Sequence, residues 1–261
     1  MKLLPALLAL ALLPVAVCAA DEEGKPKLNA ANEPDLAVRK VGKPSPIFNG
    51  KDLEGWAGNK TFWSVKDGAI TGQTTPENPA KHNTFLVFTG GTVENFELTF
   101  KYKITAQNDK GFANSGVQYR SRVNQPGESG PIISGYQADF EFGKTFSGIL
   151  YEEKGRGILA KRGEKTVVKP DPADANKAQV EVVGSVGDSD AIQASIKEGD
   201  WNEYRIVAQG KHLQHFINGK QTVDVTDETP KGATEGVLAL QLHQGGAMTV
   251  QFKDIVLTEL K

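Results

Sequence analysis

The sequence predicts an all-β protein, an antiparallel β-sandwich of the jelly-roll type. Residues 96–104 alternate strictly between apolar and polar side chains, as a strand with one buried face does. Two turn signals, Asp67-Gly68 and Asn218-Gly219, each separate two strand-like runs and predict tight hairpins. No segment shows a sustained helical period, and many short strands with turns between them favour a sandwich. A jelly roll is the preferred version because it supplies a curved sheet.

The first part of the chain is expected to lie outside the folded domain. Residues 1–20 combine a basic start, an apolar run and small residues, which predicts a secretory signal peptide. The apolar run is too short and too early to favour a membrane span. A lipoprotein anchored at Cys18 is the less favoured alternative, because Val17 stands where a small residue is usual. Residues 21–43 are polar and predict a mobile linker, so the domain is expected to span 44–261.

The composition excludes several classes of function. Cys18 is the only cysteine, so cleavage after residue 20 would leave no disulfide, no thiolate nucleophile and no cysteine-based zinc site. A formal net charge of −2 gives no electrostatic case for binding nucleic acid. We therefore expect an exported protein, periplasmic or secreted, with no transmembrane segment in its mature form.

The predicted strands follow one another along the domain. In the first half they are expected at 62–65, 69–71, 96–104, 114–122, 135–142 and 148–153. Residues 161–200 are rich in Lys, Asp, Ala and Gly, and they predict a long excursion with one strand at 180–183. The later strands are expected at 201–208, 213–217, 222–225, 236–243 and 248–257. Trp56, Trp63 and Trp201 are expected in the core, because tryptophan is mostly buried.

The strands at 114–122 and 135–142 carry the main candidate site residues. Side chains alternate between the two faces of a strand, which places Gln137, Asp139 and Glu141 together on one face. By the same rule Gln118 and Arg120 are expected to share a face of the preceding strand. Amides, carboxylates and an arginine, bordered by Gly and Tyr, indicate a binding surface more than a plain solvated face.

These residue types have both catalytic and structural interpretations. Asp139 and Glu141 can serve as paired carboxylates on a glycoside, and a solvated strand face is the competing interpretation. Arg120 can bind substrate oxygens with its planar guanidinium. Its alternative role is a structural ion pair with Asp139 or Glu141. His243 is expected beside Gln241 and opposite a leucine face, where it could be a general base or a metal ligand. The remaining histidines, His82, His212 and His215, are expected at the surface or in hairpins.

Seven stretches occur here in the order that they have in one known family, and the chain resembles the 3-keto-disaccharide hydrolase domain over residues 44–261. The stretches are 48–56, 62–70, 114–120, 135–139, 201–204, 218–220 and 240–243. The resemblance implies a sandwich of the concanavalin A-like lectin/glucanase type, an exported bacterial protein, and action on sugars oxidised at C3. Many relatives carry Glu where this chain has Gln137, so no carboxylate chemistry is expected at that position.

The leading hypothesis is an enzyme that cleaves a 3-keto-glycoside. A carbonyl at C3 acidifies the C2 proton, so that a base can remove it, the C1 leaving group departs and water adds back. His243 or Asp139 would be the base, and Glu141 or Glu152 would protonate the leaving oxygen. Arg120 and Gln137 would stabilise the enolate. The full set of expected substrate contacts is Arg120, Gln118, Gln137, Gln241, Asn114 and Tyr151.

Two alternatives remain open. One is a two-carboxylate glycoside hydrolase that uses Asp139 and Glu141. The other is a non-catalytic carbohydrate-binding module, although the polar strands lack the exposed aromatic side chains that such a module would show. No metal motif of fixed spacing is present and no cofactor is expected, with a divalent ion on Asp139, Glu141 and His243 as a minor option. Of Glu152 and Glu153, only one can share a face with Tyr151.

Overall fold

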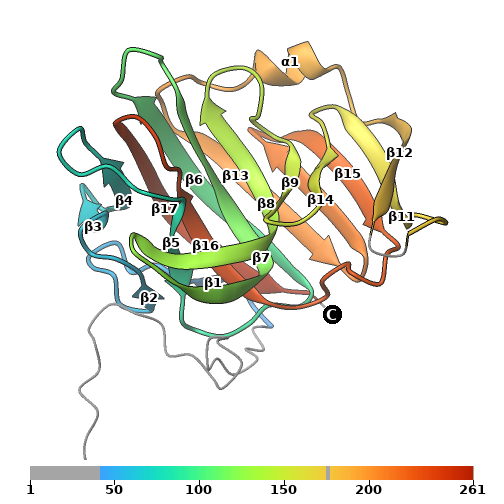
Figure 1. Ribbon diagram of the computed structural model, residues 1–261, viewed down its shortest axis with the longest axis horizontal. Helices are drawn as coiled ribbons and strands as arrows, with labels where there is room; N and C mark the ends of the chain where they lie inside the picture. The colour runs from blue at the N-terminus through green and yellow to red at the C-terminus, as the bar shows by residue number, and fades with distance from the viewer. Residues whose placement is uncertain (1–41, 175–176, 261) are drawn as a thin grey trace, which may run out of the picture.

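The computed structural model describes residues 42–174 and 177–260, which fold into two β-sheets packed face to face (Figure 1). The predicted β-sandwich is confirmed. The predicted signal peptide and nearly all of the predicted linker lie outside the described residues, so export stays a prediction. Within the described ranges the one α-helix is α1 (Ser189–Gln193), and no helix there is long and apolar enough to span a membrane.

The larger sheet has the spatial order β12-β11-β15-β14-β13-β6-β17-β4-β3, with β1 also beside β17. Its strands are β1 (Ser45–Pro46), β3 (Trp63–Lys66), β4 (Ala69–Thr74), β6 (Phe96–Ala106), β11 (Glu164–Pro170), β12 (Ala178–Ser185), β13 (Asn202–Gln209), β14 (His212–Ile217), β15 (Lys220–Asp227) and β17 (Met248–Glu259). All pairs are antiparallel apart from β11 and β15, which run parallel.

The smaller sheet has the order β10-β9-β8-β7-β16-β5-β2 and faces the viewer in Figure 1. Its strands are β2 (Trp56–Ala57), β5 (Thr84–Phe88), β7 (Ala113–Gly127), β8 (Gly130–Phe142), β9 (Leu150–Glu153), β10 (Gly157–Ala160) and β16 (Val237–Leu242). The longest of them, β7 and β8, pair with each other at its centre.

The core lies between the two sheets and follows from the alternation in the sequence. Along β6, the apolar residues from Phe96 to Ile104 are buried at every second position, and Glu97, Lys101 and Lys103 face outward. Aromatic rings fill the interior, with the centroids of Tyr102 and Phe140 only 3.9 Å apart across the two sheets. The inward face of each sheet is therefore apolar, and the polar side chains of the strands lie mainly on the outward faces.

Both predicted hairpins are confirmed. Asp67 and Gly68 have φ angles of 50° and 72°, and Asn218 and Gly219 have 49° and 79°. Two consecutive positive φ values match the right-handed twist of the strands that they join, and they favour Asn-Gly and Asp-Gly pairs. The predicted excursion at 161–200 contains α1 and two strands, β11 and β12, where the sequence analysis expected only one.

Two burial predictions are wrong. Trp201 is only half-buried on the outer face of the larger sheet, with Lys253 Nζ 4.1 Å from the ring centroid. It has the same parity as the exposed Glu203, so the alternation along β13 turns it away from the core. His215 is completely buried, because it shares the inward parity of its strand. It contacts the hydroxyls of Tyr119 and Tyr204, and burial lowers its pKa to about 3.

Candidate functional site

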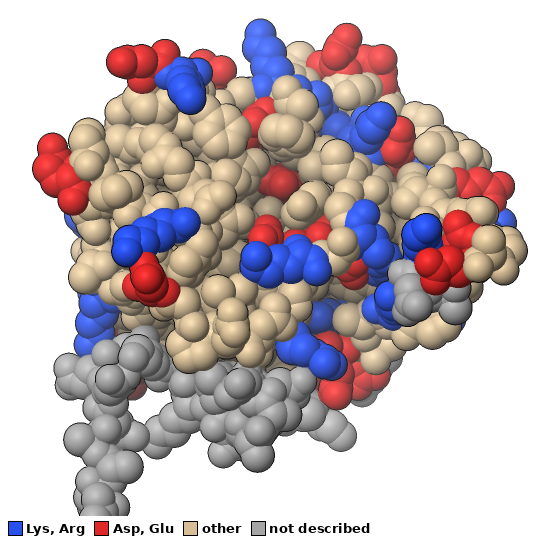
Figure 2. Space-filling model, in the orientation of Figure 1, with Lys and Arg blue, Asp and Glu red and all other residues tan. Residues whose placement is uncertain are grey.

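A pocket of about 250 Å³ opens on the outer face of the smaller sheet. Figure 2 shows this face, with acidic side chains in its hollowed middle. The strands β7, β8, β9 and β16 contribute most of its polar side chains, and Asn83 and His243 come from the loop before β5 and the turn after β16. The lining residues are Asn83, Phe112, Asn114, Gln137, Asp139, Phe146, Ile149, Tyr151, Glu153, Ile158, Gln241 and His243. Six predicted site residues therefore meet in one place: Asn114, Gln137, Asp139, Tyr151, Gln241 and His243.

The register of β7 against β8 positions the centre of the pocket. Gly116 lies opposite Asp139, and Gln118 lies opposite Gln137. A Cβ atom at Gly116 would come within 2.6 Å of Gln137 Cγ, so glycine leaves the space that this side chain occupies. Gly116 lies between Asn114 and Gln118 on this face of β7, and the close packing of Gln137 from β8 explains why this position is a glycine.

A chain of buried amides runs beneath the pocket. Gln118 Nε2 donates to Gln137 Oε1 at 2.6 Å, and Gln241 Nε2 donates to the same oxygen at 2.8 Å. Gln241 Nε2 also donates to Glu153 Oε2 at 3.3 Å. All three amides are at most 2 % exposed. Buried amides that bond to one another are fixed in orientation, so they hold the carboxylates of the pocket in place.

Asp139 is the most deeply buried acid of the pocket, at 5 % exposed. Burial raises the pKa of its carboxyl well above the usual 3.8, and the nearby charges of Glu141 and Glu153 act in the same direction. Hydrogen bonds from Asn114, at 2.9 Å to Oδ1, and from Gln137 oppose this rise without cancelling it. Asp139 therefore holds its proton more tightly than an ordinary aspartate and can act as a hydrogen-bond donor.

Glu153 lies beside Asp139 in the pocket, on the strand β9. Burial raises the pKa of its carboxyl above the usual 4.5, against smaller opposing effects of Lys154 and the amides of Asn83 and Gln241. Asn83 Nδ2 donates to Glu153 Oε2 at 3.4 Å, and Asn83 Oδ1 accepts from Gln244 N at 3.0 Å. The same asparagine therefore links this acid to the turn that follows β16.

His243 lies in that turn, half-buried at the edge of the pocket. Its Nδ1 is within hydrogen-bond distance of the carbonyl of Gln244, which assigns the ring proton to Nδ1 and leaves Nε2 as an acceptor. Burial lowers the pKa of the imidazole below its usual 6.5. His243 is therefore neutral near pH 7, the state that a general base requires.

Arg120 does not reach this pocket, and its predicted placement beside Gln118 is wrong. The register of β7 slips between Tyr119 and Arg122, and Arg120 sits there with a φ of 45°. A bulge of this kind breaks the alternation of side chains. The guanidinium instead binds the carbonyls of Glu94 at 2.7 Å and Gly210 at 2.6 Å. Arg120 ties loops together at the far end of the sandwich, and it forms no ion pair with Asp139 or Glu141 in the described structure.

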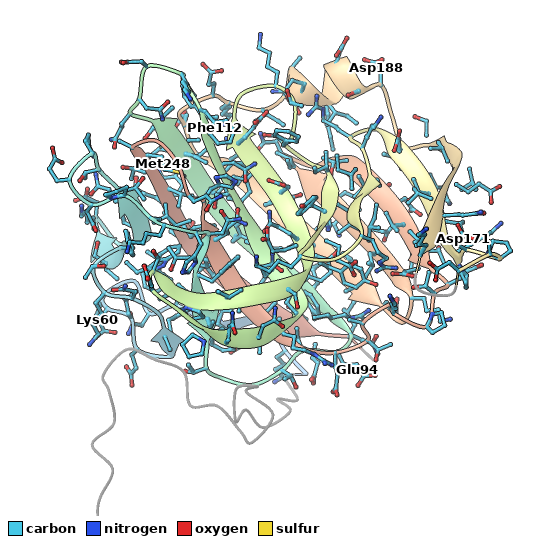
Figure 3. The ribbon with its side chains drawn as sticks, in the orientation of Figure 1. Lys60, Glu94, Phe112, Asp171, Asp188 and Met248 are labelled. Atoms are coloured by element: carbon cyan, nitrogen blue, oxygen red, sulfur yellow. The ribbon has the colours of Figure 1, made fainter. Side chains whose placement is uncertain are left out.

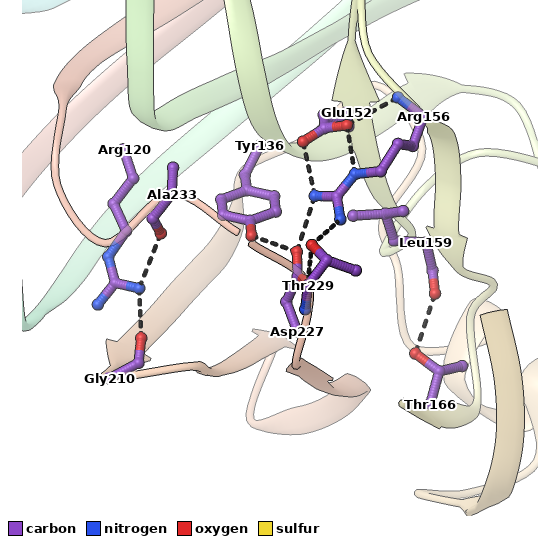
Figure 4. A network of polar contacts seen from close by, with 10 residues as sticks. All are labelled: Arg120, Tyr136, Glu152, Arg156, Leu159, Thr166, Gly210, Asp227, Thr229 and Ala233. Carbon is purple, nitrogen blue, oxygen red and sulfur yellow. Dashed lines mark hydrogen bonds and ion pairs between the residues drawn. The ribbon is translucent and has the colours of Figure 1, made fainter. Parts of the chain in front are cut away.

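Two predicted acids also lie outside the pocket. Glu141 Oε1 accepts from the backbone of Thr145 and Phe146, so this carboxylate caps the turn after β8. Glu152 forms a two-point ion pair with Arg156, at 2.7 Å for each contact (Figure 4). Both carboxylates accept hydrogen bonds that hold local structure together, and neither lines the pocket, which makes them unsuitable as its proton donor.

Of the two glutamates of β9, the sequence analysis chose Glu152 as the acid, whereas Glu153 is the one that lines the pocket. The signal was present, because Glu153 shares the parity of Ile149 and Tyr151, both of which line the pocket. Asn83 was missed altogether, because it lies in a loop just before β5, where no periodicity applies. In the described part of the chain no three His, Cys, Asp or Glu side chains gather as a metal site, and Glu141 accepts from the backbone of the turn after β8.

Two β-sheets packed face to face, with a polar pocket on the outer face of the smaller one, define a β-sandwich protein. Within that class, the chain belongs to the family of 3-keto-alpha-glucoside-1,2-lyase-like domains, whose profile matches residues 43–258. The resemblance inferred from the sequence is thereby confirmed. The family makes this a carbohydrate-active domain.

The solved structures agree with this fold. Two crystal structures of a "putative glycosyl hydrolase" from Parabacteroides distasonis match at 20% and 21% identity, each with a TM-score of 0.50 over 84% of this chain. They are covered over 94% and 100% of their own lengths. A Bacillus subtilis protein of unknown function with a galectin-like fold matches at 11% identity and a TM-score of 0.51, over 86% of this chain and 98% of that one. No protein of curated function matches the sequence.

Proposed function

We propose that this protein cleaves the glycosidic bond of 3-keto-glycosides in the pocket on the smaller sheet, by elimination followed by hydration. The observation that carries the proposal is the pair of opposite pKa shifts in one pocket. Burial lowers the pKa of His243 and raises the pKa of Asp139, which favours a neutral base beside a protonated acid. Groups whose environments push their pKa values apart are typical of acid–base sites.

His243 is the base for the first step. A ketone at C3 lets the electrons of the C2–H bond delocalise onto the C3 oxygen as the proton leaves. The free Nε2 of His243 takes this proton, while Nδ1–H stays bound to the Gln244 carbonyl and fixes the ring. The developing imidazolium is at the pocket edge, where solvent can stabilise its charge.

Asp139 stabilises the enolate that results. A neutral carboxyl group can donate its proton in a hydrogen bond to the negative C3 oxygen, which an ionised one cannot do. Asn114 and Gln137 hold the carboxyl in position through their amides. This assignment gives Asp139 the stabilising role and leaves no need for a cation at that point.

Glu153 completes the reaction as proton donor. The enolate collapses to a C1=C2 double bond, the C1–O bond breaks, and the leaving oxygen takes the proton of Glu153, whose raised pKa keeps it available. Water then adds its hydroxyl to C1 and gives its remaining proton to Glu153, while the proton on His243 returns to C2. The products are a 3-keto sugar and an alcohol, so the net change is hydrolysis.

The test is turnover of one disaccharide in its 3-keto and its unoxidised form. The proposal expects product from the 3-keto form alone and a loss in His243→Gln, while Glu203→Gln on the other sheet serves as the control. Equal activity on both forms would indicate a direct glycoside hydrolase. Binding without product from either form would indicate a carbohydrate-binding module.

A further inference from the structure

The pocket is divided between a polar floor and an apolar rim. Its carboxylates and three of its amides come from the paired strands β7, β8, β9 and β16, and the amide of Asn83 comes from the loop before β5. Four apolar side chains come from outside these strands: Phe112 from the loop before β7, Phe146 from the loop after β8, Ile149 from just before β9, and Ile158 from β10. A ligand that fills the site therefore meets hydrogen-bonding groups on its floor and apolar groups around its mouth.

Two of the rim residues are exposed to solvent to an unusual degree. Among the described residues only five large hydrophobic side chains are exposed, and Phe112 at 36% and Ile158 at 40% are two of them. The other three are valines of the edge strand β12. Exposed large apolar groups that gather at a pocket mouth are typical of a binding surface.

The two side chains lie on opposite sides of the catalytic centre. Ile158 pairs with Tyr151 across β10 and β9, at one end of the strand order. Phe112, labelled in Figure 3, packs edge-on against His243 with 5.5 Å between ring centroids, at the β7–β16 side. Asp139, on β8, lies between these strands. The rim therefore flanks the position from which a leaving group would depart.

We propose that this rim binds an apolar aglycone, so that the substrates are 3-keto-glycosides of aromatic or alkyl alcohols. The inference rests on the proposed function. The pocket of about 250 Å³ is smaller than the roughly 300–1,000 Å³ of a site that encloses a drug-sized ligand. It takes little more than one sugar ring, and the aglycone lies outside against Phe112 and Ile158.

The physical reason is the difference in desolvation between two kinds of aglycone. An aromatic or alkyl group removes apolar surface of the rim from water, which is favourable in proportion to the area covered. A second sugar would place hydroxyls against the same apolar side chains and lose hydrogen bonds to water. The floor selects the 3-keto ring, and the rim selects what is attached to it.

The experiment compares benzyl and methyl 3-keto-α-glucosides, whose leaving alcohols are similar in acidity and differ in apolar surface. We expect the wild type to prefer the benzyl compound in kcat/KM. Ile158→Ala and the double variant with Phe112→Ala should lower kcat/KM for the benzyl compound, by at least about 10-fold in the double variant. The methyl compound should change by less than about 2-fold in Ile158→Ala, which leaves His243 untouched. Val182→Ala, at an exposed valine on the other sheet and outside the pocket lining, is the matched control.

Three outcomes would overturn the inference: no benzyl preference in the wild type, an unchanged preference in the double variant, or a 3-keto-disaccharide preferred over the benzyl compound. Failure of the proposed function gives a different result, because the wild type would then turn over none of the three. In that case calorimetric binding of the benzyl and methyl compounds to the same variants still tests the rim.

Discussion

Two buried acidic clusters, one in the pocket on the smaller sheet and one where β15 of the larger sheet meets the β9–β10 hairpin, differ in a single kind of partner. Asp227, 2% exposed, receives Arg156 Nη2 at 2.7 Å and the hydroxyl of Tyr136 at 2.5 Å (Figure 4). Asp139, 5% exposed, receives only amides. Burial acts to raise both pKa values, but hydrogen bonds from Arg156, Thr229 and Tyr136 bring the pKa of Asp227 below its usual 3.8. The pKa of Asp139 stays well above that value.

The comparison teaches that burial alone does not mark a functional carboxylate. Glu152 and Glu153 are neighbours on β9, yet one binds Arg156 and the other lines the pocket. The guanidinium compensates the charge of its cluster and turns it into a structural tie between β15 and the β9–β10 hairpin. Where no guanidinium is present, the carboxyl keeps its proton and becomes available for chemistry.

The largest expected effect follows from removing that guanidinium. Arg156→Met leaves Glu152 and Asp227 as buried carboxylates without their cation, and loss of one partner of a buried ion pair costs about 3–5 kcal/mol. Urea denaturation at pH 7 measures this loss of unfolding free energy. Asp227 contributes above the pKa of 3.8 that it has when unfolded, and this contribution fades as pH falls through its lowered native pKa. The difference between variant and wild type should therefore shrink in acid.

Arg156→Lys separates charge from geometry in the same network. Lysine keeps the positive charge but cannot reproduce the bonds that Nε and Nη2 make to Glu152 and Asp227. It should recover only part of the stability. Unfolding of Arg156→Met at the wild-type urea concentration would show that this network does not stabilise the fold.

Asp139→Asn should change stability in the opposite direction from Arg156→Met: the variant should lose activity and gain stability. Turnover of a 3-keto-glycoside should fall by ~100-fold or more, the scale of a lost group that stabilises the developing oxyanion. Native Asp139 keeps its proton above pH 3.8 while the unfolded chain releases it, so wild-type stability falls as pH rises through this window. Asparagine has no proton to release. Thermal unfolding should give Asp139→Asn a higher Tm than the wild type, and the difference should be larger at pH 8 than at pH 5.

The fold could be predicted because its determinants are local. Alternation along β6 and the turn pairs Asp67-Gly68 and Asn218-Gly219 specify strands and hairpins whatever lies beyond them. The pairing of β7 with β8, by contrast, was left open by the sequence, although the convergence of their polar side chains depends on it. Alternation likewise points His215 into the core, but a histidine is easily assumed to be polar surface, and only the neighbouring Tyr119 and Tyr204 explain how its ring is satisfied.

The site could be predicted only where the strands stay regular. Gln137 and Asp139 follow the period of β8 and lie where it predicts, in the pocket. Arg120 does not, because one bulge in β7 redirects its side chain, and nothing in the local sequence specifies that slip. Asn83 comes from a loop about 70 residues before Glu153, so its contact exists only after the sheet has formed.

The neighbouring glutamates of β9 give a matched pair of variants. Glu153→Gln should lower turnover by ~10-fold for alkyl leaving groups, which need a proton, and by much less for nitrophenyl, which leaves as an anion. Glu152→Gln should leave turnover within about 2-fold while it costs about 1–3 kcal/mol of stability, because it weakens the bond to Arg156. Equal effects of the two variants on turnover would contradict the division between the clusters.

The smallest expected effect concerns the pH range of activity and the role of Asn83. On the acid side, kcat/KM should fall only below pH 6.5, because His243 must lose its proton to act and its pKa is lowered. On the alkaline side, activity is lost as Asp139 and Glu153 ionise. The amide of Asn83 lowers the pKa of Glu153, so Asn83→Ala should raise that pKa and extend activity to higher pH.

Asn83→Asp is the control for the turn after β16. Its carboxylate can still accept from Gln244 N, but it brings a negative charge where Asn83 donates to Glu153. If electrostatics at Glu153 set the alkaline limb, the limb should move further in Asn83→Asp than in Asn83→Ala, with kcat at the optimum within about 3-fold of the wild type. An alkaline limb that stays in place in both variants would mean that Glu153 is not the group that titrates there, and Asp139 alone would then carry the acid function of the pocket.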